Sequence, residues 1–335
     1  MTSRYKILMT RKLLEKDKKY VCEGLRKDVG DCFELIEPPS YDEVGICTVV
    51  EDADVILGPY ISKEIIKNAK KLKLIQIPWT GMDTFNFDAI RGTNITVCNS
   101  HSNSLEVAEF CVALIFDLLK KISYHDRKMR HGNWNRDNSP LDLGSELIAN
   151  KTFCILGYGN IGSKVGKILS FFGSEIYAVN TGKAVGKEVS KHFLNSEMMD
   201  AVLEADVVIN ALPLTKDTKG LIDENFINSM KDLSYIVNIS RAEIIDEESL
   251  YFALLNNKIS GYASDVWWNS PKRGESLSYP SAKNKFEDLD QVVFSPHRAG
   301  FLKGGLPHLD DAIKNIANFI KKESLINVID IEKNY

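Results

Sequence analysis

The sequence has no long uninterrupted run of apolar residues. No stretch approaches the roughly 20 apolar residues that a membrane-spanning helix needs. At the N-terminus, MTSRYKILMTRKLL places charged residues directly after a short apolar run, unlike the apolar segment of a secretory signal. These absences predict a soluble, cytoplasmic protein with no membrane partner.

An excess of charge of one sign is also absent. Lys and Arg together number 42 and Asp and Glu 46, which gives a formal net charge of -4, and no block of like charges stands out. Because nucleic-acid binding usually needs a basic face, we expect no nucleic-acid partner.

Cysteine spacing of the kind that binds metal is missing as well. The six cysteines form no CxxC pair, and most fall within apolar stretches; they are Cys22, Cys32, Cys47, Cys98, Cys111 and Cys154. This pattern predicts reduced, buried thiols and neither a disulfide framework nor a metal site.

What is present indicates two α/β units. A chain of 335 residues favours two domains. Residues 1–100 alternate short apolar runs with amphipathic segments, as parallel α/β sheets do. A long apolar helix is expected over 104–122, then a polar excursion over 123–150. A second series of strands and helices begins at Lys151, and an amphipathic helix is expected over 306–322.

A glycine motif indicates a dinucleotide site. Gly157, Gly159 and Gly162 form GYGNIG, with Asn160 and Ile161 inside it, directly after the apolar run TFCIL and directly before the helical run SKVGKILSFF. In this context the glycines permit a tight turn, close approach of a pyrophosphate and close helix packing. The helix N-terminus then faces the phosphates.

The residue expected to read the ribose is neutral. About 20 positions after the motif, where NAD-binding proteins carry an acidic residue, the chain has Asn180, followed by Thr181 and Lys183. No carboxylate there would repel a 2'-phosphate, so NADP(H) is slightly favoured. NAD(H), with Asn180 bonded to the ribose hydroxyls, remains an alternative.

Three polar residues end predicted strands in the C-terminal half. Arg241 follows SYIVNIS, Asp265 follows ISGYAS and His297 follows QVVFSP. Ligands bind at the carboxyl ends of strands in open α/β sheets. A cation that holds a carboxylate and a residue that supplies a proton are what reduction of a 2-oxo acid requires.

At these motifs the sequence resembles the D-isomer-specific 2-hydroxyacid dehydrogenase family. The resemblance runs through LKLIQIPWTGMD, NSLEVAE, ILGYGNIG, VNISRAEIIDEESL, GYASDVW and SPHRAG. It implies two Rossmann-like α/β domains with parallel sheets: a flavodoxin-like substrate domain of residues 1–100 and 298–335, and an inserted NAD(P)-binding domain of residues 101–297. It also implies an active site in the cleft and a homodimer to which the helix from Ser104 contributes.

The resemblance also assigns roles to single residues. Arg241 would hold the substrate carboxylate, and His297 would act as acid and base between NAD(P)H and C2 of an acid such as glyoxylate or hydroxypyruvate. Further substrate contacts would come from Thr80, Gly81, Met82 and Asn103. Further cofactor contacts would come from Pro213, Thr215, Ile239, Ser240 and Asp265.

One position departs from the family pattern. Where most members carry a Glu that pairs with the catalytic histidine, this chain has Ser270. A hydroxyl orients an imidazole but stabilises its cation less, so a lower pKa of His297 is expected. Glu275 is a candidate substitute.

The missing Glu keeps two other functions open. One is formate or phosphite oxidation on the same scaffold. The other is a dinucleotide-sensing protein without turnover; the retained Arg241 and His297 argue against it.

Overall fold

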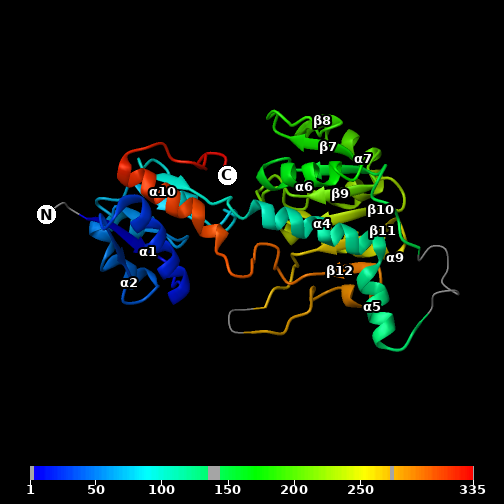
Figure 1. Cartoon of the computed structure of the whole chain (residues 1–335), viewed down its shortest axis with the longest axis horizontal. Helices are drawn as coiled ribbons and strands as arrows, with labels where there is room; N and C mark the ends of the chain where they lie inside the picture. The colour runs from blue at the N-terminus through cyan, green and yellow to red at the C-terminus, as the bar shows by residue number, and fades with distance from the viewer. Residues whose placement is uncertain (1–3, 135–143, 272–274, 335) are drawn as a thin grey trace. The chain divides into compact units, whose positions relative to one another are not determined.

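The computed structural model describes residues 4–134, 144–271 and 275–334. It divides into two compact units, Met1–Asn103 with Phe301–Tyr335 (unit 1) and Ser104–Gly300 (unit 2), shown in Figure 1. Both carry parallel sheets flanked by helices, which confirms the expected fold class. Within the described ranges, no helix is both long and apolar enough to cross a bilayer.

Unit 1 is built on a five-stranded parallel sheet of order β2-β1-β3-β4-β5. The strands are β1 (Tyr5–Met9), β2 (Phe33–Ile36), β3 (Val55–Leu57), β4 (Leu74–Gln76) and β5 (Thr96–Cys98). Successive residues of a strand point to opposite faces, and β1 shows this: Ile7 belongs to one apolar core and Leu8 to the other.

Helices cover both faces of this sheet. The core that contains Ile7 also holds apolar residues of α1 (Glu15–Val29) and α10 (Asp310–Lys321). The core that contains Leu8 holds residues of α2 (Glu43–Cys47) and α3 (Lys63–Asn68).

A buried amide pair fastens the C-terminal helix to this sheet. The side-chain amide of Asn315 donates to Gln76 Oε1 over 2.8 Å and to the Ile326 carbonyl over 2.9 Å, and its oxygen accepts from Ile326 N over 2.8 Å. Both side chains are fully buried. Since a buried amide is costly unless it is bonded, these contacts fix the position of α10.

Unit 2 is built on a seven-stranded parallel sheet of order β12-β11-β10-β9-β6-β7-β8. Its strands are β6 (Thr152–Leu156), β7 (Glu175–Asn180), β8 (Lys191–Leu194), β9 (Val207–Asn210), β10 (Ser234–Asn238), β11 (Ile259–Ser264) and β12 (Val292–Phe294). Its helices are α4 (Ser104–Lys120), α5 (Ile122–Arg130), α6 (Asn160–Ser170), α7 (Met198–Leu203), α8 (Glu224–Ser229) and α9 (Glu247–Leu255).

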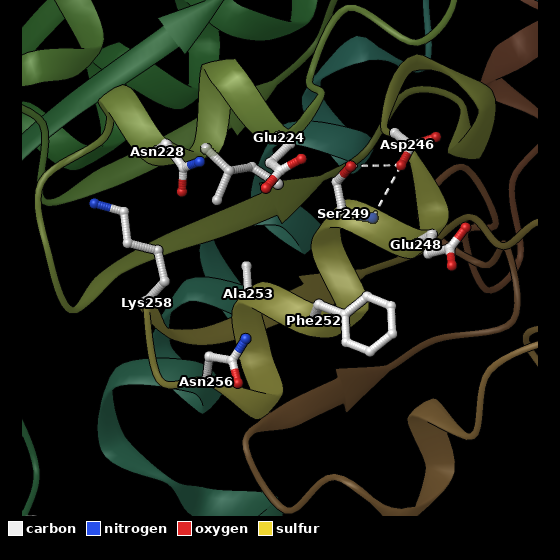
Figure 2. Close-up of a pocket in the computed structure, with 10 residues that line it drawn as sticks. Glu224, Asn228, Asp246, Glu248, Ser249, Phe252, Ala253, Asn256 and Lys258 are labelled. Atoms are coloured by element: carbon white, nitrogen blue, oxygen red, sulfur yellow. Dashed lines mark hydrogen bonds between the residues drawn. The ribbon is translucent and has the colours of Figure 1, made fainter.

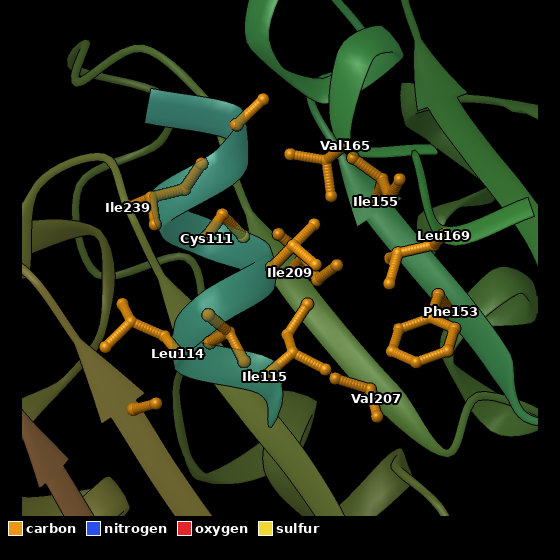
Figure 3. Close-up of a cluster of buried hydrophobic side chains, with 14 of the residues drawn as sticks. Cys111, Leu114, Ile115, Phe153, Ile155, Val165, Leu169, Val207, Ile209 and Ile239 are labelled. Atoms are coloured by element: carbon orange, nitrogen blue, oxygen red, sulfur yellow. The ribbon is translucent and has the colours of Figure 1, made fainter. Parts of the chain in front are cut away.

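Helix α4 forms much of the core on one face of this sheet. Figure 3 shows Cys111, Leu114 and Ile115 of α4 beside strand residues such as Ile209, with Val165 of α6 completing the cluster. Burying one such side chain stabilises the fold by about 1.5–3 kcal/mol. Helices α7, α8 and α9 supply the core on the other face.

Short 3-10 helices join several elements. They are η1 (Val50–Asp52), η2 (Phe87–Ala89), η4 (Asn195–Glu197), η5 (Ala242–Ile244), η6 (Phe286–Asp288) and η7 (Pro307–Leu309).

Three local expectations need correction. β8 was not predicted, because it is an edge strand whose residues are mostly exposed and which lacks an apolar run. Helix α5 opens the polar stretch 123–150, part of which lies outside the described residues; none of its residues is buried, so it shows no apolar stripe. Only Cys98, Cys111 and Cys154 are buried, whereas Cys32 is exposed.

Candidate active site

The glycine motif lies where the strand order of unit 2 reverses. Gly157 follows β6, with β9 on one side and β7 on the other, and ligands of open α/β sheets bind at such a switch point. A Cβ on Gly157 would lie 2.7 Å from the Ala211 carbonyl oxygen, and one on Gly162 would lie 2.5 Å from the Gly157 oxygen. A Cβ on Gly159 would meet no other atom within 4 Å. The turn is tight, the helix packs closely and the middle glycine faces open space, so the loop fits a pyrophosphate.

Tyr158 anchors this loop from inside. Its ring packs against α6 at Gly166, where a Cβ would lie 2.6 Å from the phenol oxygen. Its hydroxyl donates to Glu188 Oε1 over 2.8 Å. Burial, and then the Glu188 carboxylate, raise the pKa of Tyr158, so the phenol stays neutral and donates.

Asn180 is the last residue of β7, and its side chain forms hydrogen bonds to the backbone of the next turn. Its Oδ1 accepts from Gly182 N over 2.7 Å and lies 3.0 Å from His192 Nε2, while its Nδ2 donates to the Lys183 carbonyl over 3.0 Å. With His192 donating, both lone pairs of Oδ1 are used, because an amide oxygen has two. Thr181 and Lys183 lie exposed beside it.

Two buried asparagines shape the backbone before Arg241. Asn210 ends β9 and donates to Asn238 Oδ1 over 3.1 Å. Asn238 ends β10, accepts from Ser240 N over 3.1 Å and donates to the Arg241 carbonyl over 3.0 Å. Arg241 Nη1 donates to the Ser240 carbonyl over 2.9 Å. The hydrogen bonds of Asn238 thereby fix the turn that carries Arg241.

Asp265 holds the loop that carries His297. The Asp265 carboxylate is 2% exposed and accepts from the Ser295 hydroxyl, from Arg298 N over 2.7 Å and from Ala299 N over 2.9 Å. Residues on both sides of His297 are therefore bonded to one carboxylate. The indole of Trp267 adds a bond to the Ser295 carbonyl over 2.9 Å.

His297 itself adopts an unusual backbone conformation. Its φ is +57°, in the left-handed region that residues other than glycine rarely occupy. Such strain persists only where neighbouring contacts impose it, and it gathers at functional sites. The side chain is exposed. The bonds to Asp265 are the contacts that impose it here.

The loop of unit 1 that is expected to contact the substrate is also held to its sheet by hydrogen bonds. Thr80 Oγ1 donates to the Ser100 carbonyl over 2.8 Å, and Asn99 Nδ2 donates to the Thr80 carbonyl over 2.8 Å. Met82 turns its side chain into the core. Asn103 Oδ1 is buried and has no hydrogen-bond partner within the described residues.

The other predicted residues occupy simpler positions. Pro213 and Thr215 lie in a turn that Thr218 closes through bonds to the Pro213 carbonyl and the Thr215 amide. Ile239 packs in the core, and Ser240 donates to the Leu212 carbonyl. Ser270 is exposed, and no hydrogen bond joins it to His297 in the part of the chain that the structure describes.

A hollow of about 620 Å³ lies elsewhere, between α8 and α9. Figure 2 shows Glu224, Asp246, Ser249, Phe252 and Lys258 around it. None of the predicted site residues lines it. Across the described ranges, no three His, Cys, Asp or Glu side chains gather as metal ligands would.

Sequence reasoning singled out Asn180 but missed the two other asparagines that build this edge, Asn210 and Asn238. Strands β7, β9 and β10 read EIYAVN, VVIN and SYIVN, each ending in Asn. A polar amide that closes an apolar strand is the signal that was present, since Asn readily bonds the backbone of a following turn. Asn210 and Asn238 were therefore detectable as positioning residues.

A family profile decides the classification. The profile of the D-isomer specific 2-hydroxyacid dehydrogenase, NAD binding domain, matches residues 112–299. The chain belongs to this family. A glyoxylate reductase of Thermofilum pendens is 30% identical over 269 residues, which cover 78% of this chain and 76% of that protein.

Other relatives agree with this membership. A D-3-phosphoglycerate dehydrogenase of Methanocaldococcus jannaschii is 31% identical over 257 residues, 74% of this chain and 46% of its own length. The chain spans about half the length of the phosphoglycerate dehydrogenases that it matches. A crystal structure from Pyrococcus horikoshii is 28% identical, covers 99% of both chains and has a TM-score of 0.77.

Proposed function

We propose that this chain is an NAD(P)-dependent dehydrogenase that interconverts a small 2-oxo acid and its D-2-hydroxy acid. The observation that carries the proposal is the arrangement on three neighbouring strands of unit 2. Arg241 follows β10, Asp265 follows β11 and His297 follows β12, all at carboxyl ends. The reductase names of relatives support the same class.

In this mechanism the reduced nicotinamide, when bound, supplies the hydride to C2. Arg241 holds the substrate carboxylate, for which a planar guanidinium is suited. His297 donates a proton to the carbonyl oxygen in reduction and accepts it in oxidation. Asp265 positions His297 through the hydrogen bonds that hold its loop. The nicotinamide contact expected of Asp265 stays a prediction.

The turn after β7, which carries Asn180, Thr181 and Lys183, favours NADP(H) over NAD(H). The unmodified ribose diol needs an acceptor, and both lone pairs of Asn180 Oδ1 are already used by Gly182 and His192. The groups that remain at this turn are mostly donors: the second Asn180 amide hydrogen and the Lys183 ammonium, beside the Thr181 hydroxyl, which can also accept. A set of donors suits a 2'-phosphate.

We also propose a homodimer formed through unit 2. A hollow of about 440 Å³ between α4 and β12 is lined by Phe110, Ala113, Leu114, Val293 and Phe294, among others. Phe294 is 38% exposed. Apolar surface of this kind, next to a long apolar helix, is suited to contact with a second copy.

The test is the oxidation of reduced nicotinamide by the purified protein. Glyoxylate and hydroxypyruvate are offered with NADPH and, separately, with NADH, and the near-ultraviolet absorbance of the cofactor is followed. We expect NADPH to be consumed faster and the Arg241→Ala variant to lose the reaction. Cofactor binding without consumption would overturn the proposal, and formate or phosphite with the oxidised cofactor would then be tested.

A further inference from the structure

Arg11 and Trp79 meet at the carboxyl edge of the unit 1 sheet. Arg11 follows β1, and Trp79 directly precedes the loop Thr80-Gly81-Met82. The Arg11 guanidinium carbon lies 5.0 Å from the centroid of the indole ring. Strand β3 lies between β1 and β4 in this sheet, so the arginine reaches across the end of β3.

Gly58, directly after β3, leaves room for the chain that carries Arg11 across the end of this strand. Its φ is +137°, and a Cβ there would lie 2.6 Å from Thr10 Oγ1 and 3.3 Å from Arg11 N. A larger residue would displace the turn that carries Arg11. The arginine is therefore placed by a built turn and an aromatic face, and a guanidinium over an indole is favourably held.

This edge has polar groups that the protein does not satisfy. Thr10 and Asn99 are buried, and neither Thr10 Oγ1 nor Asn99 Oδ1 has a hydrogen-bond partner within the described residues. Unpaired buried polar atoms are uncommon and call for a ligand or water. Arg11 is exposed, and no carboxylate of the described chain pairs with it.

Arg11 also acts electrostatically on His308. Burial lowers the pKa of His308, Asp17 and Asp310 oppose that effect, and Arg11 reinforces it. Arg11 thus contributes positive potential to this edge. A guanidinium that pairs with no carboxylate of the described residues suits an anion from outside the chain.

We propose that Arg11 selects the far end of the substrate. The inference rests on the proposed function and on the substrate contacts expected of Thr80, Gly81 and Met82, the loop that directly follows Trp79. Arg11 then receives a second anionic group on the same carbon chain, a carboxylate or a phosphate, both of which a guanidinium can bind through two hydrogen bonds. The preferred substrates are dianionic 2-oxo acids.

Matched substrate pairs test this. Phosphohydroxypyruvate is compared with hydroxypyruvate, and oxaloacetate with 2-oxobutanoate, so that each pair differs in one anionic group. The wild type is expected to show the lower KM for the charged member of at least one pair. Arg11→Gln should raise that KM about tenfold, which equals about 1.4 kcal/mol, and leave kcat and the uncharged member nearly unchanged. Lys12→Gln, next to it and also exposed, is the control.

The outcomes separate the two proposals. No reaction with any of the four acids would contradict the proposed function. Reaction with hydroxypyruvate but no preference for the charged members, or an equal effect of Arg11→Gln on both members, would overturn the role of Arg11 alone. If Arg11→Gln lowers the unfolding temperature, Arg11→Lys keeps the charge and should retain part of the preference.

Discussion

At the scale of single residues, the site depends on amides and carboxylates that hold backbone in place. Asp265 shows the principle, because one buried side chain accepts from residues on both sides of His297. The strained backbone of His297 is maintained by these contacts. Substitution of Asp265 should therefore affect the geometry of His297, the proposed proton donor, more than the binding of cofactor.

Asp265→Asn tests that role. The amide would turn donor hydrogens toward the Arg298 or Ala299 N–H and leave a buried donor unpaired, at a cost of about 1–3 kcal/mol in the free energy of unfolding. Displacement of His297 should lower kcat by up to about a hundredfold, a larger change than any in the cofactor Kd. Denaturant titration and steady-state kinetics measure both, and the exposed Asp288→Asn is the control. A fall in stability with unchanged kcat would contradict the positioning role.

Asn180→Asp tests the cofactor preference. A carboxylate at the end of β7 would repel a 2'-phosphate and offer the ribose diol an acceptor. We expect the Kd of NADPH to rise about tenfold, equal to about 1.4 kcal/mol, and that of NADH to fall. Fluorescence titration with each cofactor measures this beside Asn195→Asp, an exposed control in η4. Equal changes for both cofactors would refute the donor-set argument.

At the scale of elements, the sequence predicted the helices and strands that bury an apolar face. The helix expected over 104–122 is α4, and the motif loop joins β6 to α6 as expected. Edge strand β8 and helix α5 were not predicted, because exposed elements show no periodic pattern of apolar residues. The hydrogen bonds of Asp265 were equally hidden, since they join residues 30 or more positions apart that only the fold brings together.

Glu146 connects the segment before β6 to the sheet of unit 2. Its carboxylate accepts from the Tyr235 hydroxyl and pairs with Lys151 at 2.5 Å. Burial alone would raise its pKa, but Lys151 and Tyr235 outweigh burial, and the pKa of Glu146 lies below the usual 4.5. A lowered pKa means that the unfolded chain binds the proton more readily, so this contribution is present above pH 4.5 and is lost as pH falls further.

The pH dependence of unfolding tests that contact. The denaturant midpoint of the wild type should fall below pH 4.5, and Glu146→Gln should show a shallower fall because the variant has no proton to bind there. Glu175→Gln, at an exposed position of β7, is the control. If the denaturant midpoints of the wild type and Glu146→Gln fall equally steeply below pH 4.5, Glu146 does not contribute to the pH dependence.

At the scale of the whole molecule, the sequence indicated two α/β units. The resemblance also implied a homodimer to which the helix from Ser104 contributes, and that stays a prediction. Exposed apolar residues alone could not indicate such a surface, because they look the same in sequence whether or not they are covered. Phe294, beside α4, and Phe252, a residue of α9, illustrate this: both are exposed, and they line different hollows.

Ala113→Glu tests the proposed dimer. Ala113 is exposed on α4, so a glutamate there should leave the fold intact and place a charge in the α4–β12 hollow. Sedimentation velocity should show a dimer for the wild type, a monomer for Ala113→Glu and a dimer for the control Phe252→Glu. A dimer in all three would place the interface elsewhere.

The central claim is hydride transfer to C2 of a 2-oxo acid. It is tested most directly with NADPH that carries deuterium at the transferable position of its nicotinamide, and glyoxylate or hydroxypyruvate as acceptor. The product 2-hydroxy acid, examined by mass spectrometry, should contain a single deuterium at C2, and Arg241→Ala should form none. Unlabelled product, or no product while cofactor binds, would contradict the account.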